Sequence, residues 1–156
     1  LMSYRLTSEV ILDRPLDEVF EFFADAANLE AITPPELRFR YLTPLPIEME
    51  KGRLIEYRLS LYGVPFRWLT EIAVWDPGVC FVDQQLRGPF AKWVHTHNFE
   101  ALGENRTRIY DEVEYALPLA PVGNLALPLV RAKLDRIFSY REQRVAELLA
   151  PGGRAV

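Results

Sequence analysis

The amino-acid sequence predicts an α+β domain in which a curved antiparallel sheet of seven strands wraps around one long C-terminal helix. Three observations lead to this prediction. Apolar and polar residues alternate with a period of two from residue 36 onward, two short helical segments precede that region, and a long helical stripe follows it. Because one sheet must cover its apolar face, the long helix is the only large partner that the pattern offers.

The first strand and the two short helices are expected within residues 4–32. "YRLTSEVIL" is typical of a strand, with Leu6, Ser8, Val10 and Leu12 on one face. The next segment has a helical stripe, with Asp13 as a candidate cap and Pro15 suited to a first turn. A second short helix, "NLEAI", ends at "TPP", because two prolines cannot continue it.

The middle of the chain predicts half-buried antiparallel strands, separated by the turn signals "DPG" at 76–78 and "RGPF" at 87–90. The alternation places one set of side chains on the inner face: Ile55, Tyr57, Leu59, Leu61, Phe66, Trp68, Thr70, Ile72 and Val74. The last strand, "RTRIYDEVEYAL", turns Thr107, Ile109, Asp111, Val113 and Tyr115 the same way. Large aromatic and polar side chains thus share the concave face, which predicts a cavity beneath the helix.

The final helix is expected from about residue 122 to 149. Its apolar residues recur at helical spacing: Leu127, Val130, Leu134, Ile137, Phe138, Val145 and Leu148. Pro128 should kink this helix or delay its regular start. We expect one domain over residues 1–150 and a flexible tail over residues 151–156.

Composition excludes several classes of function. The formal net charge of −4, without any block of Lys or Arg, argues against a nucleic-acid partner. The single cysteine, Cys80, permits neither an intrachain disulfide nor a cysteine metal cluster. No apolar run reaches membrane-spanning length, so integral membrane association is not expected, and a cytoplasmic location is the default.

Four stretches together resemble a known group of proteins: "FEFFADAANLEAITPPELRF", "FVDQQLRGPFAKWVHTHNF", "DEVEYALPLAPVGNLA" and "IFSYR". They resemble the bacterial SRPBCC superfamily, which shares the helix-grip fold of START and birch-pollen-allergen proteins, and its ligand-binding or cyclase/dehydrase-like branch in particular. The resemblance covers nearly the whole chain and implies the helix-grip fold. Its members share a cavity and no common set of catalytic residues, so the resemblance implies cavity-lining residues and leaves any catalytic residue unknown.

Both histidines of the chain lie in "KWVHTHNFE". The alternation places His95 and His97 on one face with Trp93 and Phe99, whose large rings favour burial, so both histidines are expected to face the cavity. If the hairpin turn lies in "ALGEN", His95 faces Asp111 across the next strand, and a slip of two residues puts Asp111 opposite His97 instead. Asp83 and Gln85 join the same face if Phe81 points inward.

Three interpretations of this polar group compete. It can be a buried hydrogen-bond network that fixes the sheet, or it can recognise a hydroxyl, carbonyl or carboxylate of a ligand. It can also act in catalysis or bind a metal, through a His–Asp acid/base pair or two histidines and one carboxylate. Residues two apart on a strand lie about 6.5–7 Å apart, which does not favour convergence on one ion, so we expect no tightly bound metal. Arg141, near the stripe of the last helix, can hold a ligand carboxylate or form an ordinary salt bridge.

The sequence therefore predicts a domain that binds a hydrophobic small molecule (a lipid, polyketide-like or isoprenoid compound) between sheet and helix, without a cofactor. Two alternatives remain open: a cyclase or dehydratase that uses a His–Asp pair for proton transfer, and an interaction module for a partner enzyme. The predicted ligand-binding residues are Tyr57, Leu59, Phe66, Trp68, Thr70, Asp83, Gln85, Trp93, His95, His97, Phe99, Asp111, Val130, Leu134 and Phe138.

Overall fold

A computed structural model describes residues 2–150, so the tail predicted at 151–156 lies outside the described residues. Seven antiparallel strands form one sheet in the order β1-β7-β6-β5-β4-β3-β2. Their bounds are β1 Tyr4–Leu12, β2 Arg40–Tyr41, β3 Leu54–Leu61, β4 Val64–Asp76, β5 Cys80–Arg87, β6 Lys92–Gly103 and β7 Arg106–Ala116. Each strand from β3 to β7 pairs with the next one along the chain, and the N-terminal strand β1 pairs with β7. The predicted seven-stranded sheet is confirmed.

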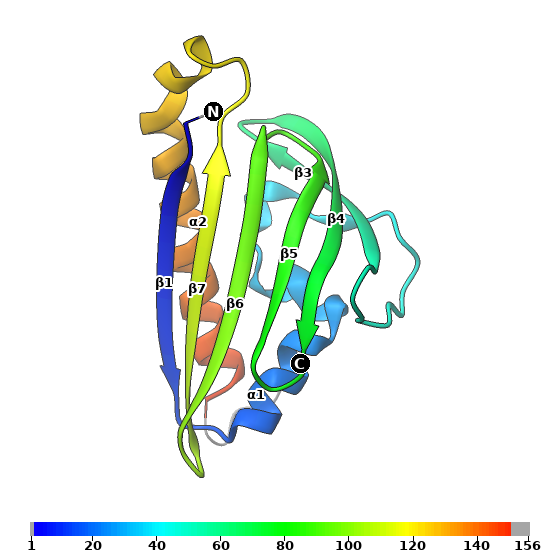
Figure 1. The fold of residues 1–156 in the computed structure, drawn as a ribbon, viewed down its shortest axis with the longest axis vertical. Helices are drawn as coiled ribbons and strands as arrows, with labels where there is room; N and C mark the ends of the chain where they lie inside the picture. Colours follow the sequence, from blue (N-terminus) through cyan, green and yellow to red (C-terminus); the bar gives the residue numbers. More distant parts are fainter. Residues whose placement is uncertain (1, 151–156) are drawn as a thin grey trace.

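The helices are α1 Leu16–Ala24 and α2 Leu127–Leu148, with short 3₁₀ segments η1 Ala26–Ile32, η2 Pro35–Leu37 and η3 Val122–Ala126. Figure 1 shows α2 running behind β1 and β7 along the sheet, while α1 lies at its lower end. The expected cap is wrong: α1 begins after Pro15 and has no side-chain cap, since Pro15 itself takes the N-cap position two residues after Asp13. Among residues 2–150, none of the helices combines the length and apolar character that crossing a membrane requires.

Helix α2 covers the concave face as predicted. Leu134 and Phe138 are buried against the sheet, and Leu127, Val130 and Ile137 pack at their margin. The regular helix starts at Leu127, after η3, with Pro128 in the first turn, where its missing N–H leaves no helical hydrogen bond unmade. Pro128 therefore delays the start of the helix.

Two groups of buried side chains lie between the helices and the sheet. The first, which we call the α1 core, consists of Leu12, Val19, Phe20, Phe22, Phe23, Ile32, Phe81, Phe99, Ile109, Val145, Leu148 and Leu149. The second, the α2 cluster, consists of Leu37, Leu59, Trp68, Trp93, Val113, Tyr115, Leu117, Leu134 and Phe138. The α1 core packs around the rings of α1, whereas the α2 cluster borders a cavity.

The hairpin between β6 and β7 corrects one expectation. The favoured register, with His95 opposite Asp111, is wrong, and His97 pairs with Asp111 while His95 pairs with Val113. The chain reverses at Glu104 and Asn105, and an irregularity between Ala101 and Gly103 offsets the two strands. A slip of two residues preserves side-chain parity, so the inward set of both strands stays as predicted.

Candidate ligand cavity and its polar end

A cavity of about 500 Å³ lies between the sheet, α2 and the segment from α1 to β2. Its wall contains most of the side chains that the strand and helix patterns select: Tyr57, Leu59, Phe66, Trp68, Thr70, Asp83, Trp93, His95, His97, Val130, Leu134 and Phe138. The cavity is the consequence of a curved sheet covered by a helix that offers few large apolar side chains. Its volume is in the range of small-molecule sites.

Phe99 and Gln85, two predicted cavity residues, do not line it. Phe99 belongs to the α1 core, with ring centres 5.0 Å from Phe20 and 5.5 Å from Phe23, because α1 fills this end of the sheet. The Gln85 amide forms two hydrogen bonds with the backbone of Phe90: its Nε2 donates to the Phe90 carbonyl at 2.7 Å, and the Phe90 N–H donates to its Oε1 at 3.1 Å. It satisfies the backbone of the turn between β5 and β6.

Asp111 is the third predicted residue outside the cavity wall, although it is buried directly behind the wall. Its Oδ1 accepts a hydrogen bond from His95 Nε2 at 3.2 Å and lies 3.3 Å from His97 Nδ1. The side chain is 5% exposed. Asp111 can therefore orient both imidazoles but has no direct access to a ligand in the main cavity.

Part of the wall was not predicted. Residues between Phe22 and Tyr41 close one side of the cavity through α1, η1 and the loop that leads to β2, and Arg141 contributes from α2. Segments of 3₁₀ helix and loop have no apolar period, so alternation cannot identify their inward side chains. Arg141 did carry a signal, since it stands seven residues after Leu134 and so on the same helical face.

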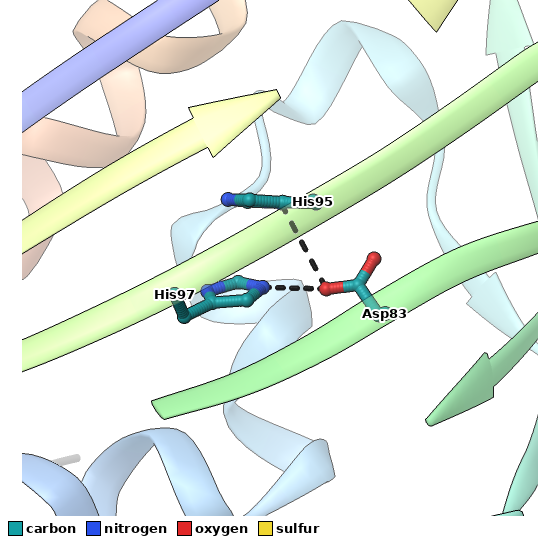
Figure 2. A group of neighbouring side chains, drawn as sticks. All are labelled: Asp83, His95 and His97. Carbon is teal, nitrogen blue, oxygen red and sulfur yellow. Dashed lines mark hydrogen bonds and ion pairs between the residues drawn. The ribbon is translucent and has the colours of Figure 1, made fainter. Parts of the chain in front are cut away.

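Four side chains form the polar end of the cavity. Figure 2 shows His95 and His97 projecting from β6 toward Asp83 on β5. Nε2 of His97 donates to Asp83 Oδ2 at 2.5 Å, while Nδ1 of His95 is 3.8 Å from the same oxygen, too far for a hydrogen bond. The imidazole rings stack with centres 3.7 Å apart, and Arg141 Nη2 lies 3.3 Å from His97 Nδ1. Together with Asp111 we call these residues the polar cluster.

The two carboxylates of the polar cluster are ionised. Burial by itself would raise the pKa of Asp111, but hydrogen bonds from His95 and His97 and the charge of Arg141 hold it well below the usual range. Burial likewise opposes ionisation of Asp83, and the electrostatic interaction with the His95 imidazole and the hydrogen bond from His97 outweigh it, so this pKa is lowered too. Both residues are acceptors only.

The two histidines differ. Burial lowers the pKa of His95, and the charge of neighbouring His97 lowers it further, against the pull of the two aspartates. Burial also opposes the charging of His97, but hydrogen bonds to Asp111 and Asp83 outweigh it, so the pKa of His97 is raised. His97 is therefore the imidazolium of the pair. His95 is the neutral one, with its proton on Nε2 facing Asp111 and a bare Nδ1.

Asp83, His95 and His97 are also the residues of the described chain that could hold a metal, because one ligand atom of each lies within 4.8 Å of the others. The geometry fits poorly. The rings stack at an interplanar angle of 24°, so their in-plane nitrogen lone pairs lie in nearly parallel planes and do not converge on one point beside the rings. Tetrahedral ligand atoms at bonds of 2.0–2.1 Å stand about 3.3 Å apart, farther than His97 Nε2 and Asp83 Oδ2 are.

One more polar atom beside the cavity has no partner. Trp68 Nε1 is buried without a hydrogen-bond acceptor among the described residues, and its ring stands edge-on to Trp93. The Tyr57 hydroxyl lies 3.5 Å from Thr70 Oγ1, and burial raises the pKa of Tyr57, which keeps it neutral and able to donate. The middle of the wall thus offers donors within a mainly aromatic surface.

Comparison with known proteins gives a family and a fold. The family model for polyketide cyclase / dehydrase and lipid transport matches residues 12–138. A search of curated protein sequences finds no significant match.

Three solved structures illustrate the likeness in fold. The Zhui aromatase/cyclase of Streptomyces sp. R1128 has a TM-score of 0.75 at 18% identity, covering 93% of this chain and 92% of that one. A START superfamily protein of Mycobacterium smegmatis has a TM-score of 0.66 at 15% identity, covering 92% and 98%. The major latex-like protein 151 of Panax ginseng has a TM-score of 0.65 at 14% identity, covering 97% and 100%. These likenesses confirm the helix-grip fold.

Proposed function

Because this chain belongs to the polyketide cyclase / dehydrase and lipid transport family, we propose that it binds a hydrophobic small molecule in the cavity between the sheet and α2. The family comprises ligand-binding and aromatase/cyclase-type proteins, and the proposal narrows this to a lipid, polyketide-like or isoprenoid compound. The observation that carries it is the cavity of about 500 Å³, with aromatic and aliphatic walls and polar groups gathered at one end. Such a composition is typical of small-molecule sites.

The buried donor of Trp68 supports the proposal. A buried N–H without an acceptor costs free energy, and a carbonyl or hydroxyl oxygen of a ligand could accept from it after a small movement of the neighbouring rings. The interaction-module alternative predicts a solidly packed interior, so it gains no support from an open cavity.

The test is mass spectrometry of organic extracts from the purified protein. We expect an apolar compound in near-stoichiometric amount from the wild type. Val130→Trp, which places an indole in the cavity, should lose it, whereas Ala132→Trp, on the exposed side of the same helix, should retain it. Equal retention by both variants would place the compound elsewhere, and an empty wild type that binds no apolar probe would contradict the proposal.

An enzymatic function, a cyclase or dehydratase, is the second candidate, and His95 favours it. His95 lines the cavity, and its neutral ring has no proton on Nδ1, while Nε2 donates to Asp111, which orients the ring and stabilises the charge after proton transfer. His95 could remove a proton next to a substrate carbonyl and return it to a departing hydroxyl, releasing water. A rate on a polyketide-like substrate that follows the ionisation of His95 and is lost in His95→Gln would support this function, whereas bound compound recovered unchanged from both proteins would argue against it.

A further inference from the structure

Arg141 is a cavity residue whose protein contacts leave most of its hydrogen-bond donors unused. It stands in the C-terminal half of α2, partly buried, with Cζ 5.5 Å from the centre of the Phe23 ring. Among residues 2–150 its guanidinium forms no ion pair and makes one polar side-chain contact, with His97 Nδ1. By contrast, Arg136 and Arg144 on the same helix each pair with a glutamate. Most of the five N–H donors of Arg141 therefore lack an acceptor within this part of the chain.

The one contact that Arg141 makes is available only to a neutral His97. An arginine can only donate, so His97 Nδ1 must present a lone pair to accept from it. Asp111 Oδ1 is equally close to the same nitrogen, at 3.3 Å, and requires it to carry a proton. The raised pKa of His97 favours the second arrangement. In that state Arg141 has no hydrogen-bond acceptor on any described side chain.

The formal charges of the polar cluster sum to zero, but the N–H donors of Arg141 are not matched by acceptors within the cluster. Asp83 and Asp111 carry two negative charges, which the imidazolium of His97 and the guanidinium of Arg141 neutralise. Both carboxylates accept hydrogen bonds from the histidines, and neither is close enough to Arg141 for an ion pair. The bare Nδ1 of His95 can take up a proton if a further negative charge enters.

The shape and lining of the cavity indicate the length and polarity of the remainder of the ligand. It extends along α2 from Leu129, which is mostly exposed, to Arg141, and these positions lie about 18 Å apart at 1.5 Å per residue. Asp83, His95, His97 and Arg141 lie at one end, and aromatic and aliphatic side chains such as Phe66, Trp68 and Leu134 line the wall between. At the Leu129 end the ammonium of Lys133 lies over the Tyr62 ring, 4.7 Å from its centre. A ligand that fits both features has one acidic group and an elongated or flat apolar body.

We propose that the cavity binds an amphiphilic organic acid whose carboxylate, or comparable acidic oxygen group, accepts hydrogen bonds from Arg141, with its apolar body extending toward Leu129 and Tyr62. The planar guanidinium suits this role because two parallel N–H groups match two carboxylate oxygens. This inference rests on the proposed function, since it names the class of molecule that the same cavity takes.

The experiment uses a neutral fluorescent reporter and a matched pair of competitors. N-phenyl-1-naphthylamine reports on the apolar cavity, and dodecanoic acid and dodecanamide, which have the same length and differ in charge, displace it at pH 7.5. We expect the acid to bind about 10- to 100-fold more tightly than the amide, the usual range for hydrogen bonds to a charged group. Arg141→Gln should bring the two within about threefold while the reporter still binds. Arg141→Lys keeps the positive charge but lacks the two parallel N–H groups of the guanidinium, so its preference for the acid should lie between those of the wild type and Arg141→Gln.

Arg136→Gln is the control, because it removes one positive charge from the outer side of the same helix, and it should keep the full preference for the acid. Melting curves of all variants establish that each is folded. Reporter binding with equal displacement by acid and amide, or an unchanged preference in both Arg141→Gln and Arg141→Lys, would overturn this inference alone. A wild type that binds no reporter would overturn the inference and the proposed function together.

Discussion

The α1 core and the α2 cluster are built from the same kind of sheet surface, yet the first is packed and reaches the cavity only along one side, whereas the second lies open to it. In the α1 core, α1 brings Phe20 and Phe23 into ring contact with Phe99. In the α2 cluster, the helix contributes Leu134 and Phe138 as its buried side chains over the cavity. The sheet supplies aromatic rings to both, so the helix, and not the sheet, determines where a cavity remains.

The largest expected effect compares one phenylalanine from each region. Phe99→Ala should destabilise the fold by about 3–5 kcal/mol, since it removes a buried ring that contacts Phe20, Phe23 and Phe81. Phe66→Ala should cost about 1 kcal/mol, because Phe66 borders space that is already empty and is only half-buried. Urea unfolding of both variants measures the difference. Equal losses would mean that the cavity wall is as tightly packed as the α1 core.

This comparison also explains what the sequence could and could not predict. A period of two on the strands and a helical stripe at the end were enough for the fold, because both patterns depend on local geometry alone. They could not separate Phe99 from Phe66, since both face inward and only the approach of α1 distinguishes them. The pattern gave the correct face and left the depth of packing open.

The sequence predicted which residues form the polar cluster better than it predicted the contacts among them. Alternation placed His95, His97 and Asp111 together, but the hairpin turn of Glu104 and Asn105 lacks the Asn-Gly or Asp-Gly signal that would locate a tight turn, so the register across the hairpin was not determined. The nearest partners of Arg141 depend on how α2 lies across the sheet, which a helical stripe does not determine.

The second prediction contrasts the two aspartates of the polar cluster. Asp111→Asn should destabilise by about 3 kcal/mol, since a buried carboxylate that serves both histidines is lost. Asp83→Asn should cost about 1 kcal/mol, because its side chain is 18% exposed to the cavity and water can replace part of its contacts. Urea unfolding gives both values.

A double-mutant cycle of Asp111→Asn with His95→Gln checks the contact itself. We expect a coupling free energy of about 0.5–3 kcal/mol, as for directly bonded pairs. The matched cycle of Asp111→Asn with Phe66→Ala should be additive, since Asp111 does not reach the cavity wall. Additivity in the first cycle would show that Asp111 does not hold His95.

A smaller effect is expected from pH, and it should come from the polar cluster, because the α1 core contains no titratable side chain. The folded pKa of His97 is raised, so its stabilisation is fully present below the ordinary histidine value of 6.5 and is lost as pH rises through the folded pKa. The pKa of His95 is lowered, so its contribution is present above 6.5 and is lost as pH falls. These opposite signs should give a stability maximum near neutral pH.

Melting temperatures from pH 5 to 9 separate the two histidines. In His97→Gln the loss of stability on the alkaline side should disappear, while the loss on the acid side, which comes from His95 in this pH range, should remain. A wild-type alkaline slope that persists unchanged in His97→Gln would mean that this histidine is not the charged one.

The smallest expected effect is that of added zinc or iron, which should leave the stability of the protein unchanged. Binding zinc or iron at Asp83, His95 and His97 would require breaking the His97–Asp83 hydrogen bond and removing a proton from a histidine whose pKa is raised. The ion would also lie close to the guanidinium of Arg141, which is 3.3 Å from His97, and the stacked rings would have to turn before their lone pairs converged.

We therefore expect less than about 1 °C of change in melting temperature on adding zinc or a chelator to protein purified without a histidine tag, because only a ligand that prefers the folded state stabilises it. His95→Ala is the control, since a genuine site would lose its metal in that variant. Near-stoichiometric zinc or iron in elemental analysis of the wild type, absent from His95→Ala, would show that the polar cluster rearranges to bind a cation and would reverse the assignment of Arg141 as its free positive charge.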